Sequence, residues 1–369
     1  MPTPPCPYFG SCGGCSAQHI EYDIQVRNKR DTLAAATGVE DIKVFIGGEY
    51  FYRNRMDLIF HRGGIGFREK GKWQSVVDIE RCVISNERLN ILIKEIREFF
   101  HDIDAFDIRK CSGTFRYAVI RTPQEDSAIS FVLNADSTRL AEAIEQIKAF
   151  AEMTTANNII ITRVPAKTDI STSDDYFVVK GSEYLKETYL GKQFVYHVQG
   201  FFQNNTEMTL KMQEYVHNIL KSNETKDAHL LDLYGGVGTF GIINAPLFKG
   251  VTIIESVEQA IDAANKNITI NNATNAKAIV LDAMQLKKVD LPKPLFVITD
   301  PPRTGMHLKT IEALHKLKPQ VMIYISCNVE QLVKELPKFT GYTIKSVALF
   351  DLFPQTTHSE SVVELVLKS

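Results

Sequence analysis

The sequence has no long hydrophobic run, and this absence limits the classes of protein to which it can belong. No apolar stretch reaches the roughly 20 residues that a helix needs to span a bilayer. The first residues also lack the charged-then-apolar pattern of a secretion signal. We therefore expect a cytoplasmic protein that does not bind membranes, and we expect it to act as a monomer.

The sequence also has almost no excess of charge of either sign. Its 42 Lys and Arg and 44 Asp and Glu give a formal net charge of −2, which excludes a histone-like binder of nucleic acid. An enzyme that docks on RNA is not excluded, because the N-terminal half holds a local group of basic residues. These are Arg27, Lys29, Arg30, Arg53, Arg55, Arg62, Arg68, Lys70 and Lys72.

Cysteine is scarce, and its distribution is uneven. Three of the six cysteines crowd the start of the chain and three are solitary: Cys6, Cys12 and Cys15, then Cys82, Cys111 and Cys327. Disulfides are rare in a reducing compartment, so we expect these thiols to be metal ligands, catalytic groups or core residues.

The length of 369 residues predicts two domains, because single cores rarely grow beyond about 250–300 residues. The first half mixes helical periodicity with short hairpins. Helices are expected at 20–36, 89–100 and 140–153, and hairpins at 52–60 with 65–68 and at 114–122 with 127–133.

From about residue 206 the pattern changes to apolar strands that alternate with helices. Strands are expected at 229–234, 251–254, 278–281, 295–299 and 320–325, followed by a terminal pair at 343–350 and 361–367 without a helix between them. Apolar strands alternating with helices indicate an α/β fold with a parallel sheet covered on both faces. A terminal antiparallel pair is typical of Rossmann-type class I methyltransferases that use S-adenosylmethionine.

A glycine-rich loop follows the first of these strands. Gly236, Gly238 and Gly241 satisfy G-x-G-x-x-G, which is also the pattern of nicotinamide dehydrogenases, and glycines of this kind can simply permit helix–strand packing. Asp232 before the glycines and the terminal hairpin favour S-adenosylmethionine. Two carboxylates at later strand ends fit the rest of such a cofactor: Glu255 for the ribose hydroxyls and Asp282 for the adenine amino group.

Three groups near the C-terminus fit chemistry on uracil. C5 of uracil is a poor nucleophile until a thiolate adds to C6, and a base must then remove the C5 proton. Cys327 supplies a thiol, Glu360 a base, and Asp300 lies at a strand end that should share their sheet edge. Taken alone, Cys327 is as compatible with a buried structural thiol as with a catalytic one. A lone histidine such as His358 is often only a hydrogen-bonded spacer.

The loop 300–303 has the sequence Asp-Pro-Pro-Arg. Enzymes that methylate exocyclic nitrogens of adenine or cytosine carry a related Asn/Asp-Pro-Pro-aromatic loop, but here Arg303 replaces the aromatic residue. Those enzymes need no cysteine, so this loop together with Cys327 favours uracil.

These motifs together resemble the RNA uracil-5 methyltransferase family, over essentially the whole chain. The resemblance implies that Cys327 is the nucleophile and Glu360 the proton acceptor. It also implies cofactor contacts at family positions, namely Gln203, Tyr234, Gly236, Glu255 and Asp300, with Thr239 standing where some members have asparagine. Arg303 matches a family arginine, and we place it with His358 near the substrate.

The three N-terminal cysteines, spaced Cys6-x5-Cys12-x2-Cys15, need a fourth ligand, and both Cys82 and Cys111 are available. A four-cysteine zinc site usually has two C-x2-C pairs, and only one is present. An iron–sulfur cluster fits better. The resemblance implies a 4Fe–4S cluster whose fourth ligand is Cys82.

The expected organisation follows from these assignments. Residues 1–85 hold the iron–sulfur site and begin an RNA-facing α+β region, 86–195 continue it, and 196–369 form the methyltransferase domain. Some relatives begin with a small β-barrel (TRAM) RNA-binding domain, which we expect to be missing here. The resemblance is strongest to the cluster-containing branch that modifies 23S rRNA. tRNA is the alternative substrate, and an inactive RNA-binding protein on the same scaffold is a more remote alternative.

Overall fold

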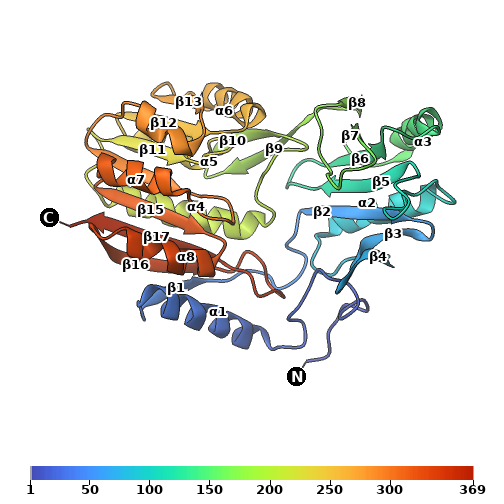
Figure 1. The fold of residues 1–369 in the computed structure, drawn as a ribbon, viewed down its shortest axis with the longest axis horizontal. Coiled ribbons are helices and arrows are strands. Elements are labelled where there is room, and N and C mark those ends of the chain that lie inside the picture. The colour runs from blue at the N-terminus through green and yellow to red at the C-terminus, as the bar shows by residue number, and fades with distance from the viewer. Residues whose placement is uncertain (1, 369) are drawn as a thin grey trace. The chain divides into compact units, whose positions relative to one another are not determined.

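The computed structural model describes residues 2–368 and divides them into two compact units (Figure 1). The N-terminal unit contains the chain up to Glu21 with residues 48–187 and 197–206. The C-terminal unit contains residues 22–47, 188–196 and the chain from Glu207 onward. No helix in the described part of the chain has both the length and the apolar character needed to cross a membrane.

The N-terminal unit is built on a seven-stranded sheet in the order β4-β3-β2-β5-β6-β7-β8. Its neighbours are antiparallel except β6 and β7, which run parallel. The strands are β2 (Arg55–His61), β3 (Gly64–Glu69), β4 (Lys72–Asp78), β5 (Phe115–Arg121), β6 (Ala128–Asn134), β7 (Asn158–Val164) and β8 (Tyr176–Lys180). Both expected hairpins are therefore confirmed.

Helices α2 (Glu87–Phe99) and α3 (Leu140–Met153) share one apolar core with this sheet. The side chain of Asn86 starts α2 by accepting the N–H of Leu89. The buried positions Leu89, Leu92, Ile93 and Ile96 follow the helical period, so one face of α2 points into the core. The two helices occur where the periodicity predicts them.

The C-terminal unit is built on an eight-stranded sheet in the order β1-β16-β17-β15-β14-β11-β12-β13. All neighbours are parallel except β17, which is antiparallel to both β15 and β16. The strands are β1 (Ile42–Phe45), β11 (His229–Leu233), β12 (Gly250–Glu255), β13 (Ala276–Val280), β14 (Leu295–Thr299), β15 (Val321–Ser326), β16 (Tyr342–Phe350) and β17 (Glu360–Leu367). The expected strand alternation and terminal antiparallel pair are confirmed.

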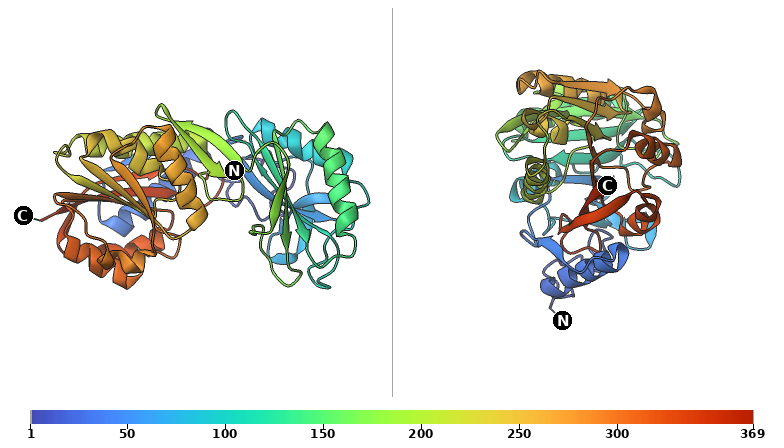
Figure 2. Two further views of the ribbon diagram at one scale, coloured as in Figure 1. Left: turned by 90° about the horizontal axis from the view of Figure 1, so that it is seen from above. Right: turned by 90° about the vertical axis from the view of Figure 1, so that its left-hand side faces the viewer.

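Helices lie on both faces of this second sheet (Figure 2). They are α1 (Tyr22–Thr37), α4 (Thr206–Lys221), α5 (Thr239–Asn244), α6 (Glu258–Ile270), α7 (Leu308–Leu317) and α8 (Val329–Glu335). Every residue of β11, β14 and β15 is buried, as expected for strands covered on both faces. A separate hairpin, β9 (Tyr184–Tyr189) with β10 (Lys192–His197), contains two of the points where the chain passes between the units.

The early segment α1–β1 belongs to the C-terminal unit, which the sequence does not indicate. Strand β1 extends the sheet by pairing with β16, and the ring of Phe45 stacks on Phe350 with centroids 4.5 Å apart. Lys29 of α1 forms a buried ion pair with Asp351, with Nζ and Oδ1 2.7 Å apart. Lys29 was grouped with the basic residues available for RNA; that grouping is wrong, because its charge is sequestered.

Candidate active site

The strand register brings Cys327 and Glu360 together. Cys327 directly follows β15, Glu360 opens β17, and the two antiparallel strands pair Ser326 with Ser361. The hydroxyl of Ser361 donates to the carbonyl of Ser326 at 3.0 Å, which fixes that register. The next positions outward are therefore Cys327 and Glu360, on neighbouring strands at one edge of the sheet.

The Cys327 thiol lies in an environment that disfavours its charged form. Partial burial raises the pKa of Cys327 to about 11, and the carboxylates of Glu360 and Asp300 add to the shift. Arg303 acts in the opposite direction. Since Asp300 follows β14, which lies next to β15, three consecutive strands of the sheet deliver these acidic groups and the thiol to one place.

Glu360 is a buried carboxyl with an unsatisfied oxygen. It is 5% exposed, and its Oε2 has no hydrogen-bond partner among the described residues. Burial, and then the charge of Asp300, raise the pKa of Glu360 well above its usual range. A carboxyl of this kind readily takes up a proton, which is the property that a general base beside a substrate needs.

Asn328 connects the cysteine loop to the Asp-Pro-Pro-Arg loop. It begins α8 by accepting the N–H of Glu330 at 3.1 Å, and its amide donates to the carbonyl of Arg303 at 3.0 Å. The side chain of Arg303 is exposed. Desolvation and the charges of Arg303 and Lys29 lower the pKa of His358, so this exposed histidine is neutral near pH 7.

Replacing Arg303 by glutamine is expected to slow alkylation of Cys327. The thiolate is the reactive form. At pH values well below the Cys327 pKa of about 11, the thiolate fraction rises tenfold with each pH unit. Because Arg303 lowers that pKa, its loss raises the pKa and reduces the thiolate fraction at a given pH by roughly threefold to tenfold. Iodoacetamide labelling followed by peptide mass spectrometry measures the rate, and Arg303→Lys, which keeps the charge, is the control. An unchanged rate in Arg303→Gln would contradict the expectation.

A buried glutamate that the sequence analysis missed braces these loops. Both oxygens of Glu335, at the end of α8, accept hydrogen bonds, from the Met306 N–H (2.9 Å), the Gln331 amide (2.8 Å) and the Tyr324 hydroxyl (2.6 Å). A Cβ on Gly305 would lie 2.0 Å from Glu335 Oε1, so only glycine fits there. The sequence does contain a signal for this buried glutamate, namely an acidic residue within the apolar pattern of a short helix.

Glu335→Ala is expected to destabilise the C-terminal unit by about 2–4 kcal/mol, because it leaves the Met306 N–H and the Tyr324 hydroxyl buried without an acceptor. Urea unfolding measures the change. Glu330→Ala, which removes an exposed glutamate from the same helix, is the matched control. Equal midpoints for the two variants would show that the Glu335 hydrogen bonds contribute little.

The glycine-rich loop has the close packing that its sequence suggests. A Cβ on Gly241 would lie 2.8 Å from Ile253, and the Gly241 N–H donates to the buried carboxyl of Asp232 at 2.8 Å. Gly236 differs: it has φ of +53° and nothing within 4 Å of an added Cβ, so open space adjoins the loop there. Its N–H donates to Glu255 at 3.3 Å. The loop and the end of β12 thus form a cradle that a nucleoside-bearing cofactor fits.

Two of the other expected cofactor residues follow strands of the same sheet. Tyr234 follows β11 with a left-handed φ of 62°, and Asp282 follows β13, where it accepts the N–H of Met284 at 2.8 Å. The hydroxyl of Thr239, the first residue of α5, lies 3.4 Å from the Gln213 amide. Gln203 lies between β10 and α4 in the N-terminal unit, and its cofactor contact stays a prediction.

Comparison with known proteins identifies the family. The family model described as tRNA (Uracil-5-)-methyltransferase matches residues 21–368. The chain belongs to this family. It is 33% identical to the tRNA (uracil(54)-C(5))-methyltransferase of Pyrococcus abyssi, over 98% of this chain and 86% of that relative. The corresponding Pyrococcus horikoshii protein is 32% identical, over 98% of this chain and 85% of its own.

A solved structure supports the same conclusion. The crystal structure of the P. abyssi tRNA (uracil-54, C5)-methyltransferase in complex with S-adenosyl-L-homocysteine matches with a TM-score of 0.81 and 30% identity, over 96% of this chain and 86% of that one. The C-terminal unit therefore has the α/β fold of class I S-adenosylmethionine-dependent methyltransferases. The chain is an RNA (uracil-5-)-methyltransferase.

The N-terminal cysteines of this family member share a cavity of about 390 Å³ in the N-terminal unit. Its lining includes Cys6, Cys12, Cys15 and Cys82, whereas Cys111 is exposed elsewhere. Burial, opposed by a hydrogen bond from Gln18 and reinforced by the other three thiols, raises the pKa of Cys15 to about 12. The side-chain amide of Asn90 in α2 accepts a hydrogen bond from the Cys82 N–H at 2.8 Å and donates one to the Cys82 carbonyl at 3.0 Å.

The arrangement does not match a site for one metal ion. Within residues 2–368, no three side chains of His, Cys, Asp or Glu converge closely enough to hold a single ion. The four cysteines line one cavity, and the expected 4Fe–4S cluster stays a prediction.

Proposed function

We propose that this methyltransferase acts through a covalent bond between Cys327 and C6 of a uracil extruded from its RNA stack. The Cys327 thiolate adds to C6, and the electrons of the C5–C6 double bond move to C5 and O4 as an enolate. When bound, S-adenosylmethionine supplies an electrophilic methyl group, which C5 can then accept. The observation that carries the proposal is the register that sets Cys327 beside a buried, unsatisfied Glu360.

Glu360 completes the reaction. Its carboxylate removes the C5 proton, the C5–C6 double bond re-forms, and the C6–S bond breaks to release the Cys327 thiolate. The raised pKa of Glu360 supports this role, because a weakly acidic carboxyl binds the transferred proton well. The charge of Arg303 acts on both Cys327 and His358, and we assign Arg303 and His358 to the uracil and its flanking phosphate.

The chain's own residues provide the seat for the methyl donor. Glu255 would accept hydrogen bonds from the ribose hydroxyls, and Asp282 would accept one from the adenine amino group. The open space at Gly236 admits the nucleoside. Tyr234, Thr239, Asp300 and Gln203 complete the proposed contacts. The S-adenosyl-L-homocysteine in the P. abyssi relative supports this assignment.

The RNA has two candidates. Two Pyrococcus relatives align with 98% of this chain, and their names favour a tRNA uridine equivalent to position 54 as the substrate. A uridine of 23S rRNA is the second candidate, and it is favoured by the resemblance to the cluster-containing branch that modifies rRNA.

Mapping 5-methyluridine separates the two candidates. Total tRNA and rRNA from a strain lacking this gene would be compared with the parent strain by nucleoside mass spectrometry. Loss of 5-methyluridine from tRNA alone assigns tRNA, and loss from 23S rRNA alone assigns rRNA. Retention in both would refute both assignments.

We also propose that Cys6, Cys12, Cys15 and Cys82 hold a 4Fe–4S cluster. The shared cavity and the mutual influence of the four thiols support it. Metal binding would deprotonate the four thiols. In its absence, burial raises the pKa of Cys6, Cys12 and Cys15. Methyl transfer involves no electron transfer, so the group's contribution is to brace the N-terminal loop against the sheet.

Anaerobically purified protein is expected to be brown and to contain about four irons per chain. Cys82→Ser should lose most of the iron, whereas Cys111→Ser, which alters the exposed cysteine, should keep it. Stoichiometric zinc in place of iron would refute the cluster, and iron loss in Cys111→Ser alone would refute the choice of Cys82.

A further inference from the structure

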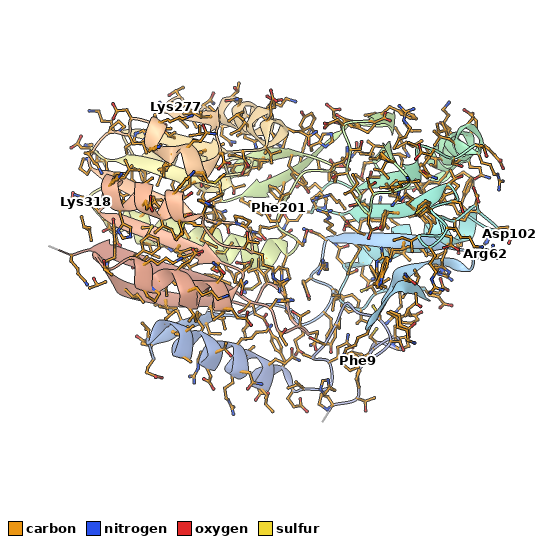
Figure 3. All side chains as sticks on the ribbon, viewed as in Figure 1. Phe9, Arg62, Asp102, Phe201, Lys277 and Lys318 are labelled. Carbon is orange, nitrogen blue, oxygen red and sulfur yellow. The ribbon has the colours of Figure 1, made fainter. Side chains whose placement is uncertain are left out.

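A second cavity of the N-terminal unit, of about 420 Å³, contains none of the residues assigned above to catalysis, to the cofactor or to the cysteine site. Strands β2, β3 and β4 form one side of it, and the loop of residues 103–113 forms the other. Five cationic side chains contribute to its lining: Arg62, Arg68, Arg109, Lys110 and Arg116. Arg62 lies at the turn between β2 and β3, where Figure 3 labels it.

The carboxylates that line this cavity are already engaged. Asp107 accepts the backbone N–H of Arg109 at 2.9 Å. Asp104 accepts the hydroxyl of Thr114 at 2.7 Å, and Asp169 is ion-paired with Arg68 at 3.0 Å. Asp107 also interacts electrostatically with Arg109 and Lys110, so the lining keeps an excess of cations, five against three carboxylates.

Three of the cations lack a salt bridge within the described residues. Across residues 2–368, Arg62, Arg109 and Lys110 form no salt bridge. All three are exposed, so each can turn toward a ligand in the cavity without breaking a salt bridge.

Arg116 is a buried cation in the lining of the same cavity. It is 2% exposed, its guanidinium donates to the carbonyls of Pro165 (2.9 Å) and Thr168, and it lies 4.1 Å from the centre of the Phe106 ring. Its Nε has no hydrogen-bond partner in the described chain, and it has no carboxylate ion pair. A buried guanidinium held by neutral carbonyls keeps its positive charge available to an anion.

We propose that this cavity binds a backbone phosphate of the RNA substrate, at a nucleotide other than the methylated uridine. An excess of arginine and lysine around a cavity of nucleotide size matches a phosphodiester, and RNA presents one such group per nucleotide. The inference rests on RNA being the substrate, but not on the Cys327 chemistry.

The only tryptophan of the chain provides a reporter. Trp73 on β4 is 57% exposed, and the guanidinium of Arg68, which lines the cavity, lies 5.6 Å from its ring. A nucleotide bound here would alter the surroundings of Trp73. We therefore expect RNA to change the intrinsic tryptophan fluorescence of the protein.

The test uses full-length chain carrying Cys327→Ala, titrated with tRNA and with 23S rRNA fragments at several salt concentrations. Adding Arg109→Gln with Lys110→Gln should weaken binding about tenfold at low salt and reduce the salt slope by about 1–2. The control adds Lys94→Gln with Lys148→Gln, two exposed lysines on the helices of the same unit, and should match the parent.

Equal affinities and slopes for the two double variants would overturn the proposal. So would saturable binding of uridine monophosphate that Arg109→Gln with Lys110→Gln abolishes while RNA binding is unchanged, because the cavity would then serve a free nucleotide. Intact RNA binding by a wild-type chain that fails to methylate would instead count against the proposed function and leave the phosphate site standing.

Discussion

Cys327→Ala is expected to lower the rate of uracil methylation by at least about 10⁴-fold, because without the thiol nothing can add to C6 and make C5 nucleophilic. Single-turnover transfer of labelled methyl groups to RNA measures the effect. Affinity for RNA should change little, since the thiol acts on one atom of one base. The defect should therefore be in the chemical step.

Cys111→Ala is the matched control for this variant. Cys111 is exposed in the N-terminal unit and has no place in the proposed chemistry, so its loss should leave the rate unchanged. Methylation by Cys327→Ala at near wild-type rate would rule out covalent catalysis by this residue.

Glu360→Gln is expected to slow turnover by about 10²–10⁴-fold and, unlike Cys327→Ala, to accumulate an intermediate. The amide cannot take the C5 proton, so the C6–S bond cannot break after C5 has been methylated. Protein joined to RNA should persist on a denaturing gel in the presence of S-adenosylmethionine. Because a glutamine fits the volume of the buried Glu360, the fold should tolerate the change.

Glu364→Gln serves as the control, because Glu364 lies on the same strand and is also buried but pairs with Lys345 at 3.0 Å. It should turn over normally and form no persistent adduct. A Glu360→Gln enzyme that is slow yet never accumulates protein–RNA adduct would place the function of Glu360 before covalent addition, contrary to the proposal.

The sequence predicts most of the fold because the signals are local. Continuous apolar runs such as residues 295–299, alternating with helical segments, indicate strands buried on both faces, and helix α3 occupies the expected range. The proximity of Cys327 and Glu360 is predicted only in part. Both residues adjoin strand ends that are expected at one edge of the sheet, but α8 and β16 separate β15 from β17 in the chain, so the register that sets them side by side depends on a long-range pairing.

What the sequence does not predict depends on long-range partners. The four residues of β1 join a sheet whose other strands lie far along the chain, so no local pattern reveals their partner β16. The sequence predicts an exposed cation at Lys29, because its partner Asp351 is 322 residues away in the chain. Glu335 looked like an ordinary helical glutamate, and its function depends on Met306 and Tyr324, which come from other elements.

The covalent bond itself can be tested with RNA in which 5-fluorouridine replaces the target uridine. Fluorine at C5 cannot be removed as a proton, so the reaction should stop with enzyme, methyl group and RNA joined. Nuclease and protease digestion followed by mass spectrometry should find a methylated fluorouridine nucleotide on the peptide containing Cys327. A nucleotide attached to any other cysteine, or none attached at all, would contradict the account.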